Sequence, residues 1–582
     1  MRRAFGRQPT QVGASSNRPE LRVWGLALGY WVQVREAVRR ALWALAALGW
    51  KERLCFLVLI VIAGAALAHA RAYSGEVIDD AFITFRYSWN LVHGGGLTFN
   101  PGERVEGTSS SPFALLIAIP LAMGLDPYRA AAWVGSLAFA TCCWAAYWGV
   151  RASVRDESGR VLGLCAALLV ASSAQLAFYS QTGLETLLYA SLVAVALALQ
   201  LAAATNPEAQ PTWATVFGVA ALVRPEGVAF FLLSFAIGCA FRGREPGAVK
   251  RAKSELSRFA FVFAPWLAFR RVYYGAWVPN SVLAKGGHLG WLFHSTVRTA
   301  LLGVADGPGG TLLKGYAQSH VLATALLLGT LLLKQTRQAG VTVLAFALGC
   351  GALAVFSDGD WMPFERTLTP CITPLAMGAA LGLRGLFFHT EQRTRVGHAP
   401  SYALTALALA LMVLGARTRL PVELKRSVDL ARVRRMGERL AALTRNDDLV
   451  ATELAGILPF YWRAKTLDMA GLCDAHIAAK GTPTQSGAGR KDVAYVAAQR
   501  PTFYAFNLVS EAADFYTEPA FAPYHDEYAL LQFPYRYLAP LKALPLMIFV
   551  RKDRKELAAL TRAAGARLID PGAELIRLGY LP

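Results

Sequence analysis

The chain has 582 residues, of which 55% are hydrophobic and only 17% are charged. The apolar residues come in runs, the longer ones of about 16 to 21 residues, close to the length with which a helix crosses a bilayer. These runs exclude a soluble globular domain, because water could not solvate them. The formal net charge is +20, but the lysines and arginines lie mostly in short loops and in the N-terminal tail, where they orient a membrane protein. We therefore expect a membrane protein that has no nucleic-acid partner.

The N-terminal tail, residues 1–53, is basic and precedes the first apolar run, which begins at Leu54. A signal peptide is not expected, because its apolar segment would follow a much shorter basic stretch. The charge rule predicts that this tail is cytoplasmic. Within it, Leu21 to Trp50 mixes Trp, Leu and Arg, which is typical of a helix lying in the membrane interface.

The segment 54–415 predicts a polytopic α-helical membrane domain with about eleven transmembrane helices. The expected spans are Leu54 to Ala70, Ala130 to Val150, Val161 to Phe178, Leu184 to Ala203, Trp213 to Val223, Val228 to Phe241, Phe259 to Tyr274, His320 to Leu333, Val341 to Phe356, Thr367 to Leu383 and Tyr402 to Leu414. Several of these cores are too short to cross alone, so their helices should extend into the flanking loops. Pro112 to Gly124 is apolar but short, and we interpret it as a helix at the outer surface.

The positive charges place the acidic loops outside the membrane, beginning with the first outer loop, residues 71–111. Residues 416–582 then form an extracytoplasmic α/β domain, with strand-like runs at Leu449 to Ala451 and Leu546 to Val550. The basic stretch Arg417 to Arg439 argues against this orientation, although long translocated domains are largely exempt from the charge rule.

Two adjacent carboxylates, Asp79 and Asp80, are the first candidates for chemistry. The segment that follows has aromatic residues spaced as on an interfacial helix, at Phe82, Phe85 and Trp89. Adjacent residues on a helix point about 100° apart, so one carboxylate can face a cavity while the other takes a structural partner such as Arg86. The alternative is that the pair only caps the helix.

Sequence blocks in order along most of the chain point to a family. They are Asp79-Asp-Ala-Phe-Ile-Thr-Phe-Arg-Tyr87, Gly94-Gly-Gly-Leu-Thr-Phe-Asn-Pro-Gly-Glu-Arg-Val-Glu-Gly107, Thr182-Gly-Leu-Glu-Thr186, Val223-Arg-Pro-Glu-Gly227, Pro279-Asn-Ser281 with Lys285, Gly359-Asp-Trp-Met-Pro363 with Arg366, Ala455-Gly-Ile-Leu-Pro-Phe-Tyr461 and Thr466-Leu-Asp-Met-Ala-Gly471. Together they resemble the bacterial GT-C superfamily of lipid-linked-sugar glycosyltransferases, and within it the mycobacterial terminal arabinofuranosyltransferases and their relatives. The chain departs from the pattern at Thr108-Ser-Ser-Ser111 and at Glu453, which leaves the identity of the sugar open.

The resemblance implies a GT-C fold and an inverting, metal-independent transfer of a sugar from a polyprenyl phosphate to a hydroxyl of a cell-envelope glycan or lipid. A hydroxyl is a poor nucleophile and needs a carboxylate to take its proton, a role that Asp79 or Asp80 fits. The leaving phosphate needs a cation rather than a proton. Arg224, Lys285 and Arg366 are the candidates, because each lies in an outward loop next to a span.

Further residues could contact the acceptor or the sugar, namely Glu185, Arg86, Asp360 and Trp361, with Tyr87 and Trp89 as additional stacking platforms. Each has a plainer alternative. Glu185 could only orient a basic residue, and Arg224 and Arg366 could form interfacial ion pairs with neighbouring glutamates. Aromatic residues at membrane interfaces need no sugar to explain them.

A divalent metal is the weaker possibility for the cofactor. Asp358 and Asp360 are two positions apart and could share an ion, but an isolated pair lacks further oxygen ligands nearby. We therefore expect no cofactor.

A transporter or flippase for a lipid-linked glycan is the rival function. Transporters place ionisable residues near the middle of spans and show repeated halves, whereas here the acidic residues cluster in outer loops. The helix break at Arg224-Pro-Glu-Gly227 is the feature that favours the rival. A non-catalytic envelope assembly protein is a third alternative. In each case we expect a multi-pass protein of the bacterial cytoplasmic membrane, with its active site and C-terminal domain on the extracytoplasmic side.

Overall fold

The computed structural model describes residues 49–206, 209–243, 245–285, 308–332, 336–356, 362, 364–387, 430–442, 444–484, 489–506, 509–532, 547–554, 561 and 567–581. The chain divides into two compact units, Met1–Val58 and Leu59–Pro582. The interfacial helix expected within Leu21 to Trp50 lies almost wholly outside the described residues, and the span expected at Tyr402 to Leu414 lies entirely outside them. The domain boundary expected near residue 415 also falls outside them.

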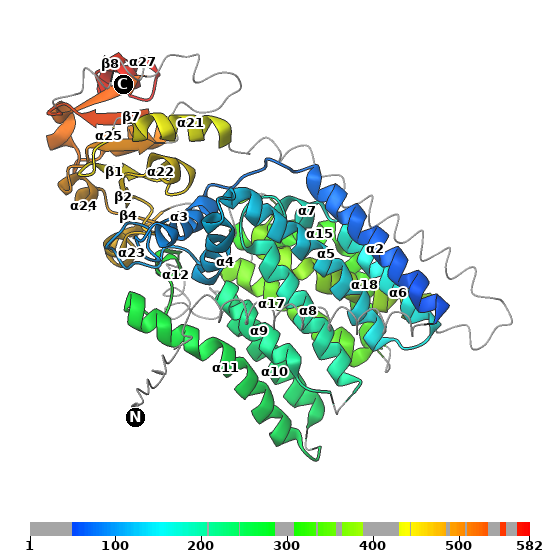
Figure 1. The fold of residues 1–582 in the computed structure, drawn as a ribbon. Coiled ribbons are helices and arrows are strands. Elements are labelled where there is room, and N and C mark those ends of the chain that lie inside the picture. The colour runs from blue at the N-terminus through cyan, green and yellow to red at the C-terminus, as the bar shows by residue number, and fades with distance from the viewer. Residues whose placement is uncertain are drawn as a thin grey trace, which may run out of the picture. The chain divides into compact units, whose positions relative to one another are not determined.

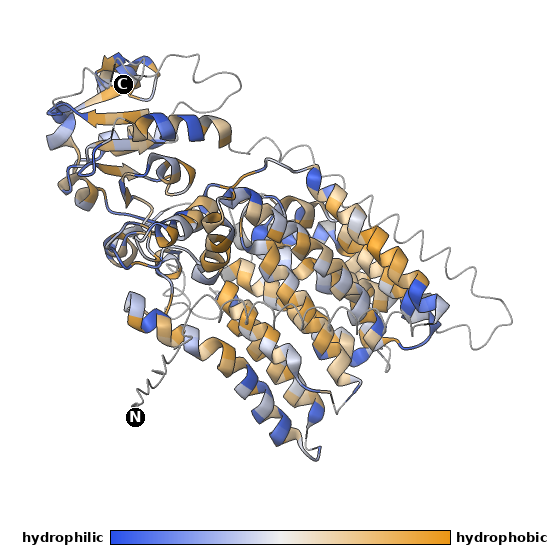
Figure 2. Ribbon diagram, in the orientation of Figure 1, coloured by the Kyte–Doolittle hydropathy of each residue, from blue (hydrophilic) through white to orange (hydrophobic). Residues whose placement is uncertain are grey.

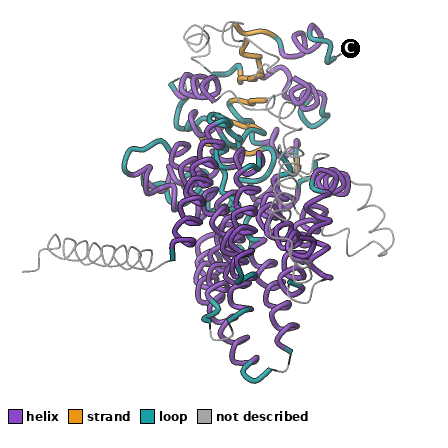
Figure 3. Tube along the Cα trace, turned by 90° about the vertical axis from the view of Figure 1, so that its right-hand side faces the viewer, coloured by secondary structure: helices purple, strands orange, loops and turns teal. Residues whose placement is uncertain are grey.

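The described part up to residue 387 is helical (Figures 1 and 3). Its elements are α2 (Trp50–Arg71), α3 (Asp80–Val92), α4 (Ser111–Ala122), α5 (Pro127–Ser153), α6 (Glu157–Ala171), α7 (Ala174–Tyr179), α8 (Thr186–Ala204), α9 (Thr212–Val223), α10 (Glu226–Arg242), α11 (Ala248–Tyr274), α12 (Asn280–Lys285), α15 (Pro308–Ser319), α16 (Val321–Gly329), η2 (Thr330–Leu332), α17 (Arg337–Phe356), η3 (Arg366–Cys371) and α18 (Ile372–Phe387). Among these, α2, α5, α8 and α17 are long and apolar enough to cross a membrane. Figure 2 shows hydrophobic residues along their length.

Local sequence explains where several of these helices begin. Asp126 caps α5 by accepting the backbone N–H of Arg129 at 2.9 Å, and Pro127 occupies the first helical position, where its missing N–H costs nothing. Small residues then let helices approach, because a side chain at Gly135 of α5 would collide with the backbone of Ser180.

Three of the expected spans differ in the structure. Val161 to Phe178 is not one helix, because α6 ends at Ala171 and Ser173 caps the separate helix α7 by accepting the N–H of Leu176. The segments expected as spans from His320 and from Thr367 each include a turn of 3-10 helix, η2 and η3. Helix α15 has no counterpart among the expected spans.

Helix α3 belongs to the protein interior rather than to the membrane interface, which corrects the interfacial helix expected there. Its residues 81–88 are all buried. The ring of Phe82 packs against Phe85 at 5.0 Å and against Phe460 of the C-terminal domain at 5.2 Å between ring centroids. The regularly spaced aromatic residues of α3 therefore pack against other parts of the protein, including the C-terminal domain.

The C-terminal part is an α/β domain with a six-stranded sheet in the order β2-β1-β5-β7-β6-β8. Its strands are β1 (Leu449–Thr452), β2 (Lys465–Asp468), β5 (Phe503–Phe506), β6 (Tyr528–Gln532), β7 (Met547–Arg551) and β8 (Arg567–Ile569), with a small hairpin of β3 (Thr482–Pro483) and β4 (Arg490–Lys491). β1 runs parallel to β2 and to β5, while the remaining pairs are antiparallel. The strand-like runs expected near residues 449 and 546 are confirmed as β1 and β7.

Helices cover both faces of this sheet. One face packs against α21 (Leu430–Ala441) and α22 (Ile457–Trp462). The other packs against α23 (Ala475–Lys480), α24 (Val493–Ala498), α25 (Val509–Thr517) and α27 (Pro571–Arg577), and the short helix η6 (Ala522–Glu527) precedes β6. Helix α21 lies within the basic stretch noted in the sequence: Met436 and Leu440 pack on the sheet, while arginines occupy the other side, which appears hydrophilic in Figure 2.

Candidate active site where the outer loops meet the C-terminal domain

The Asp79 carboxylate is bound to the C-terminal domain. Its oxygens accept the backbone N–H groups of Gly456, at 2.9 Å, and Ile457, at 2.8 Å. These groups begin α22, so Asp79 acts as a helix cap supplied by a distant part of the chain. Burial raises the pKa of Asp79 to about 7, with a contribution from Asp80, although the two N–H groups act to lower it. A side chain at Gly456 would collide with the backbone of Asp79, so this approach requires glycine.

Asp80, the first residue of α3, has a different environment. It is half-buried, and its carboxylate has no hydrogen bond or ion pair to any residue that the structure describes. It lies within electrostatic range of Asp79 and of Asp468, at the end of β2. The Asp468 carboxylate accepts the N–H groups of Ala470 (2.9 Å) and Cys473 (2.7 Å), and burial raises its pKa to about 7. Of these three carboxylates, Asp80 alone is not bound to backbone N–H groups.

Arg86 pairs with neither aspartate, which corrects the partner expected from the sequence. Its buried guanidinium donates to the oxygens of Phe99 (2.7 Å), Pro459 (2.9 Å), Ala464 (2.7 Å), Thr466 Oγ1 (3.1 Å) and Asn100 Oδ1 (3.0 Å). Burial lowers the pKa of Arg86 to about 10. Because its N–H groups are engaged in this way, Arg86 links the loop 71–111 to the C-terminal domain.

Two asparagines also bind the C-terminal domain, and together with Asp79 and Arg86 they form a set of contacts that we call the joint. The side-chain amide of Asn100 accepts the N–H of Thr466 (3.0 Å) and donates to the carbonyl of Thr466 (2.8 Å), so it pairs with edge strand β2 as another strand would. Asn280 donates to the carbonyl oxygens of Gly471 (3.0 Å) and Leu472 (2.9 Å). Several of the sequence blocks that resemble a family therefore also carry the residues that link the helical domain to the C-terminal domain.

Tyr87 and Trp89, which we expected to stack on sugars, already make contacts within the protein. Tyr87 is fully buried, and its hydroxyl accepts the N–H of Gly107 at 2.7 Å. The Trp89 indole stacks on His93, 3.8 Å between centroids, and the guanidinium of Arg463 lies 3.7 Å from the indole centroid. Neither ring is presented to a sugar in this arrangement, which corrects that expectation.

A second cluster centres on Arg224, which follows α9. Its guanidinium bridges two carboxylates, Glu185 Oε1 at 2.8 Å and Glu226 Oε1 at 2.9 Å. Burial acts to lower the pKa of Arg224, but Glu226 and Glu185 outweigh it and hold that pKa above its usual value. Ser109 of the first outer loop also donates to Glu185 Oε1, at 3.2 Å. Glu185 is thus the partner that orients a basic residue.

The loop that carries the aspartates contacts the turn that carries Glu185, the partner of Arg224. The N–H of Ile78, next to Asp79, donates to the carbonyl of Thr182 at 3.4 Å, in the turn that leads to Glu185. In that turn Gly183 has φ +83° and packs on Ala81 of α3, where a Cβ would come within 3.1 Å of the alanine side chain. The first outer loop and the α7–α8 turn are therefore in direct contact.

Of the other two expected cations, Arg366 lies near this cluster, whereas Lys285 lies on α12. Arg366 begins η3 and is within electrostatic range of Glu226. Lys285 ends α12, the helix that Asn280 anchors to the C-terminal domain. Asp360 and Trp361, like Asp358, are not among the residues that the structure describes.

Two buried polar atoms beside Arg224 lack a hydrogen-bond partner within the described part of the chain. They are Glu226 Oε2 and the Tyr189 hydroxyl. Arg224 lies 6.0 Å from the centre of the Tyr189 ring. Buried polar groups are nearly always paired, so this group of atoms indicates a place where a polar ligand or water binds.

Sequence reasoning did not single out two features of the site. Glu106 and Arg270 form a buried ion pair of 2.6 Å, and the Glu106 backbone carbonyl accepts the N–H of Asn280 at 2.8 Å. Asp468 approaches Asp80 although 388 positions separate them in the printed sequence. The block around Asp468 was visible in the sequence, but its proximity to Asp80 was not. Within the described ranges, no group of three or more His, Cys, Asp or Glu side chains is placed to hold a metal.

Comparisons with solved structures define the fold class. The chain resembles the crystal structure of ArnT from Cupriavidus metallidurans bound to undecaprenyl phosphate, with a TM-score of 0.52, 13% identity, and coverage of 86% of this chain and 98% of that chain. It also resembles the Archaeoglobus fulgidus oligosaccharyltransferase in complex with Zn and sulfate, with a TM-score of 0.54, 12% identity, and coverage of 84% and 75%. These likenesses show that the chain has the GT-C fold, as expected from the sequence.

Sequence comparison adds one match. The family model described as Domain of unknown function (DUF8728) matches residues 424–549, within the C-terminal domain. A search of curated proteins finds no match. The likeness to terminal arabinofuranosyltransferases stays a prediction from the sequence blocks.

Proposed function

We propose that this protein is an inverting membrane glycosyltransferase, which transfers a sugar from a polyprenyl-phosphate donor to a hydroxyl of a cell-envelope glycan or lipid at the outer face of the bacterial cytoplasmic membrane. The supporting observation is one connected site, in which the Asp79–Asp80 loop contacts the turn carrying Glu185, and Glu185 binds Arg224 at 2.8 Å. A carboxylate and a cation held on adjacent elements are what such a transfer needs.

Asp80 is the residue that we propose as the general base. The acceptor hydroxyl becomes a nucleophile when a carboxylate within hydrogen-bond reach takes its proton as it attacks the anomeric carbon. Asp79 has the same functional group, but its oxygens bind the N–H groups of Gly456 and Ile457. Asp79 therefore serves as a positioning residue, which fixes the start of α3 and with it Asp80.

Arg224, Arg366 and Lys285 are the groups that we propose for the donor phosphate. A phosphate is a weak base and leaves without a proton, but its growing negative charge must be stabilised. Arg224 uses one N–H on each of its terminal nitrogens for the glutamates, which leaves further N–H groups for a phosphate. Glu226 Oε2 and the Tyr189 hydroxyl, which have no hydrogen-bond partner among the described residues, are suited to bind hydroxyls of the donor sugar.

The test is sugar transfer by the purified full-length protein in nanodiscs, with a panel of radiolabelled polyprenyl-phosphate pentoses and hexoses. Asp80→Asn should lower kcat by about 10²- to 10⁴-fold, the usual contribution of a general base, while donor KM changes little. Asp570→Asn is a matched control, because Asp570 is an exposed residue that caps helix α27, far from the site in sequence. The proposal is refuted if correctly inserted Asp80→Asn protein keeps full activity.

The rival reading, a transporter of a lipid-linked glycan, is favoured by one observation. α9 and α10 are short helices of 12 and 17 residues that are interrupted at Arg224 and Pro225, as in transporters built with broken helices. Movement of a fluorescent lipid-linked glycan across proteoliposomes, without transfer of its sugar, would support the transporter instead.

A further inference from the structure

The C-terminal sheet has a topological switch point at β1. The connection from β1 to β2 runs through α22 on one face of the sheet, while the connection from β2 to β5 runs through α23 and α24 on the other face. β2 and β5 therefore lie on opposite sides of β1, and all three strands are parallel. In open α/β sheets, ligands bind in the crevice outside the carboxyl ends of the strands at such a point.

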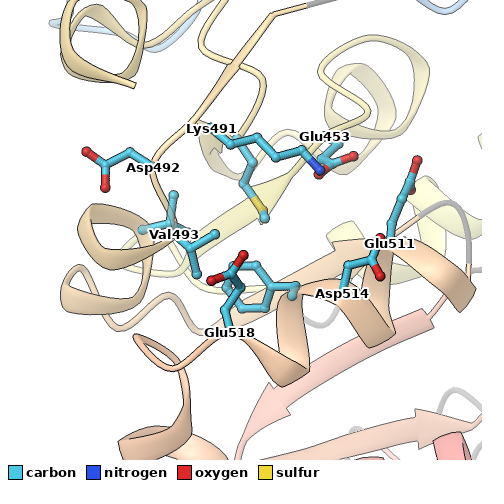
Figure 4. Close-up of a pocket in the computed structure, with 10 residues that line it drawn as sticks. Glu453, Lys491, Asp492, Val493, Glu511, Asp514 and Glu518 are labelled. Atoms are coloured by element: carbon cyan, nitrogen blue, oxygen red, sulfur yellow. The ribbon is translucent and has the colours of Figure 1, made fainter. Parts of the chain in front are cut away.

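A cavity lies at these carboxyl ends. Glu453 directly follows β1 and Met469 directly follows β2, and both line a hollow that is open to solvent. The end of β4, the start of α24, one face of α25 and the residue that follows α25 form the remaining walls, contributed by Lys491, Asp492, Val493, Val496, Glu511, Asp514, Phe515 and Glu518 (Figure 4).

The lining has an apolar base and a polar rim. Met469, Val496 and Phe515 are buried. Lys491 forms an ion pair of 2.9 Å with Glu453. Figure 4 shows Glu511 and Asp514 of α25, and Glu518 just beyond its end, among the residues that line the hollow with this pair. Of them, Asp514 and Glu518 are exposed and have no partner among the described residues.

This lining fits one chemical class of ligand. Five carboxylates and one ammonium group repel phosphates and other anions. Carboxylates accept hydrogen bonds from hydroxyls, and an apolar base contacts the C–H face of a sugar ring. A divalent cation is less well matched, since no group of three potential ligands in the described residues is placed to hold one.

The cavity shares its edge of the sheet with the candidate active site. Gly456 and Ile457, which bind Asp79, follow Glu453 by three and four positions. Met469 follows Asp468, which lies within electrostatic range of Asp80. Resting on the function proposed above, we propose that this cavity binds a neutral glycan, namely a segment of the acceptor chain beyond the hydroxyl that receives the sugar.

The test measures glycan binding separately from catalysis. The full-length protein is applied to an array of neutral, uronate-containing and amine-containing oligosaccharides, and Ca²⁺ binding is measured by calorimetry. The double variant Asp514→Ala with Glu518→Ala should weaken binding of neutral glycans by about 5- to 100-fold, the range for two lost hydrogen bonds. Alanine suits a helix, so α25 should be retained. Asp526→Ala is the matched control, because Asp526 is exposed in the same domain but does not line the cavity.

The outcomes separate this inference from the proposed function. In transfer assays the double variant should raise acceptor KM by a similar factor and leave donor KM unchanged. Binding only of amine-containing glycans or of Ca²⁺ would overturn the inference, as would transfer activity in a wild-type protein that binds no neutral glycan. Binding of neutral glycans that the double variant loses, in a protein without transferase activity, would support the cavity and contradict the proposed function.

Discussion

Asp79 and Asp80 are adjacent in sequence, and the structure predicts different consequences for replacing them. Replacing Asp79 with alanine leaves the N–H groups of Gly456 and Ile457 without their acceptor. A buried donor that loses its partner costs about 1–3 kcal/mol, so the local opening of this joint should become easier by that amount for each N–H group. Transfer activity should also fall, because Asp79 fixes the start of α3.

Hydrogen exchange measured by NMR or by mass spectrometry with fragmentation tests this prediction. The Gly456 and Ile457 amides should exchange about 5- to 150-fold faster in Asp79→Ala, which is the same cost expressed as a rate ratio. Asp80→Ala should leave these two amides as protected as in the wild type and should abolish transfer. Unchanged exchange at both amides in Asp79→Ala, or faster exchange only in Asp80→Ala, would refute this assignment of the two residues.

Four further predictions follow from the same joint and from the expected orientation. Burial raises the pKa of Asp79 and of Asp468 to about 7, so the folded state keeps protons that the unfolded state releases above about pH 4. The melting temperature should therefore fall as the pH rises from about 4 to 7, and it should fall less in Asp79→Asn. Glu106→Gln leaves Arg270 buried without its partner and should cost about 3–5 kcal/mol in unfolding free energy, whereas Glu438→Gln, in an exposed pair with Arg434, should cost less than about 1 kcal/mol. Gly107→Ala would place a Cβ 2.8 Å from Cys473 Cα and should lower the melting temperature, whereas Gly64→Ala, with nothing within 4 Å, should not. In a cysteine-free background, an impermeant thiol reagent should label Ser74→Cys only from outside intact cells and Ser257→Cys only after the membrane is opened; the reverse pattern would contradict the proposed orientation.

Much of the helical fold follows from local sequence. Long apolar runs coincide with α2, α5, α8 and α17, because a segment that water cannot solvate and that must satisfy its own backbone forms a helix. The runs near residues 449 and 546 form β1 and β7. The single span predicted from Val161 to Phe178 was wrong because of one side chain. The Ser173 hydroxyl accepts a backbone N–H and starts a new helix inside an otherwise continuous apolar stretch.

Part of the candidate site could likewise be predicted from the sequence, and part could not. The sequence alone predicted a helical membrane protein with an α/β C-terminal domain, and it singled out the adjacent carboxylates Asp79 and Asp80 and the cation Arg224 as candidates for chemistry. Only the tertiary structure decided that Asp79 binds backbone N–H groups while Asp80 does not, and that Arg86 fastens two domains. Those roles depend on partners as far as 380 positions away in the chain, as between Arg86 and Thr466. No local pattern of residues encodes which distant groups will meet a given side chain.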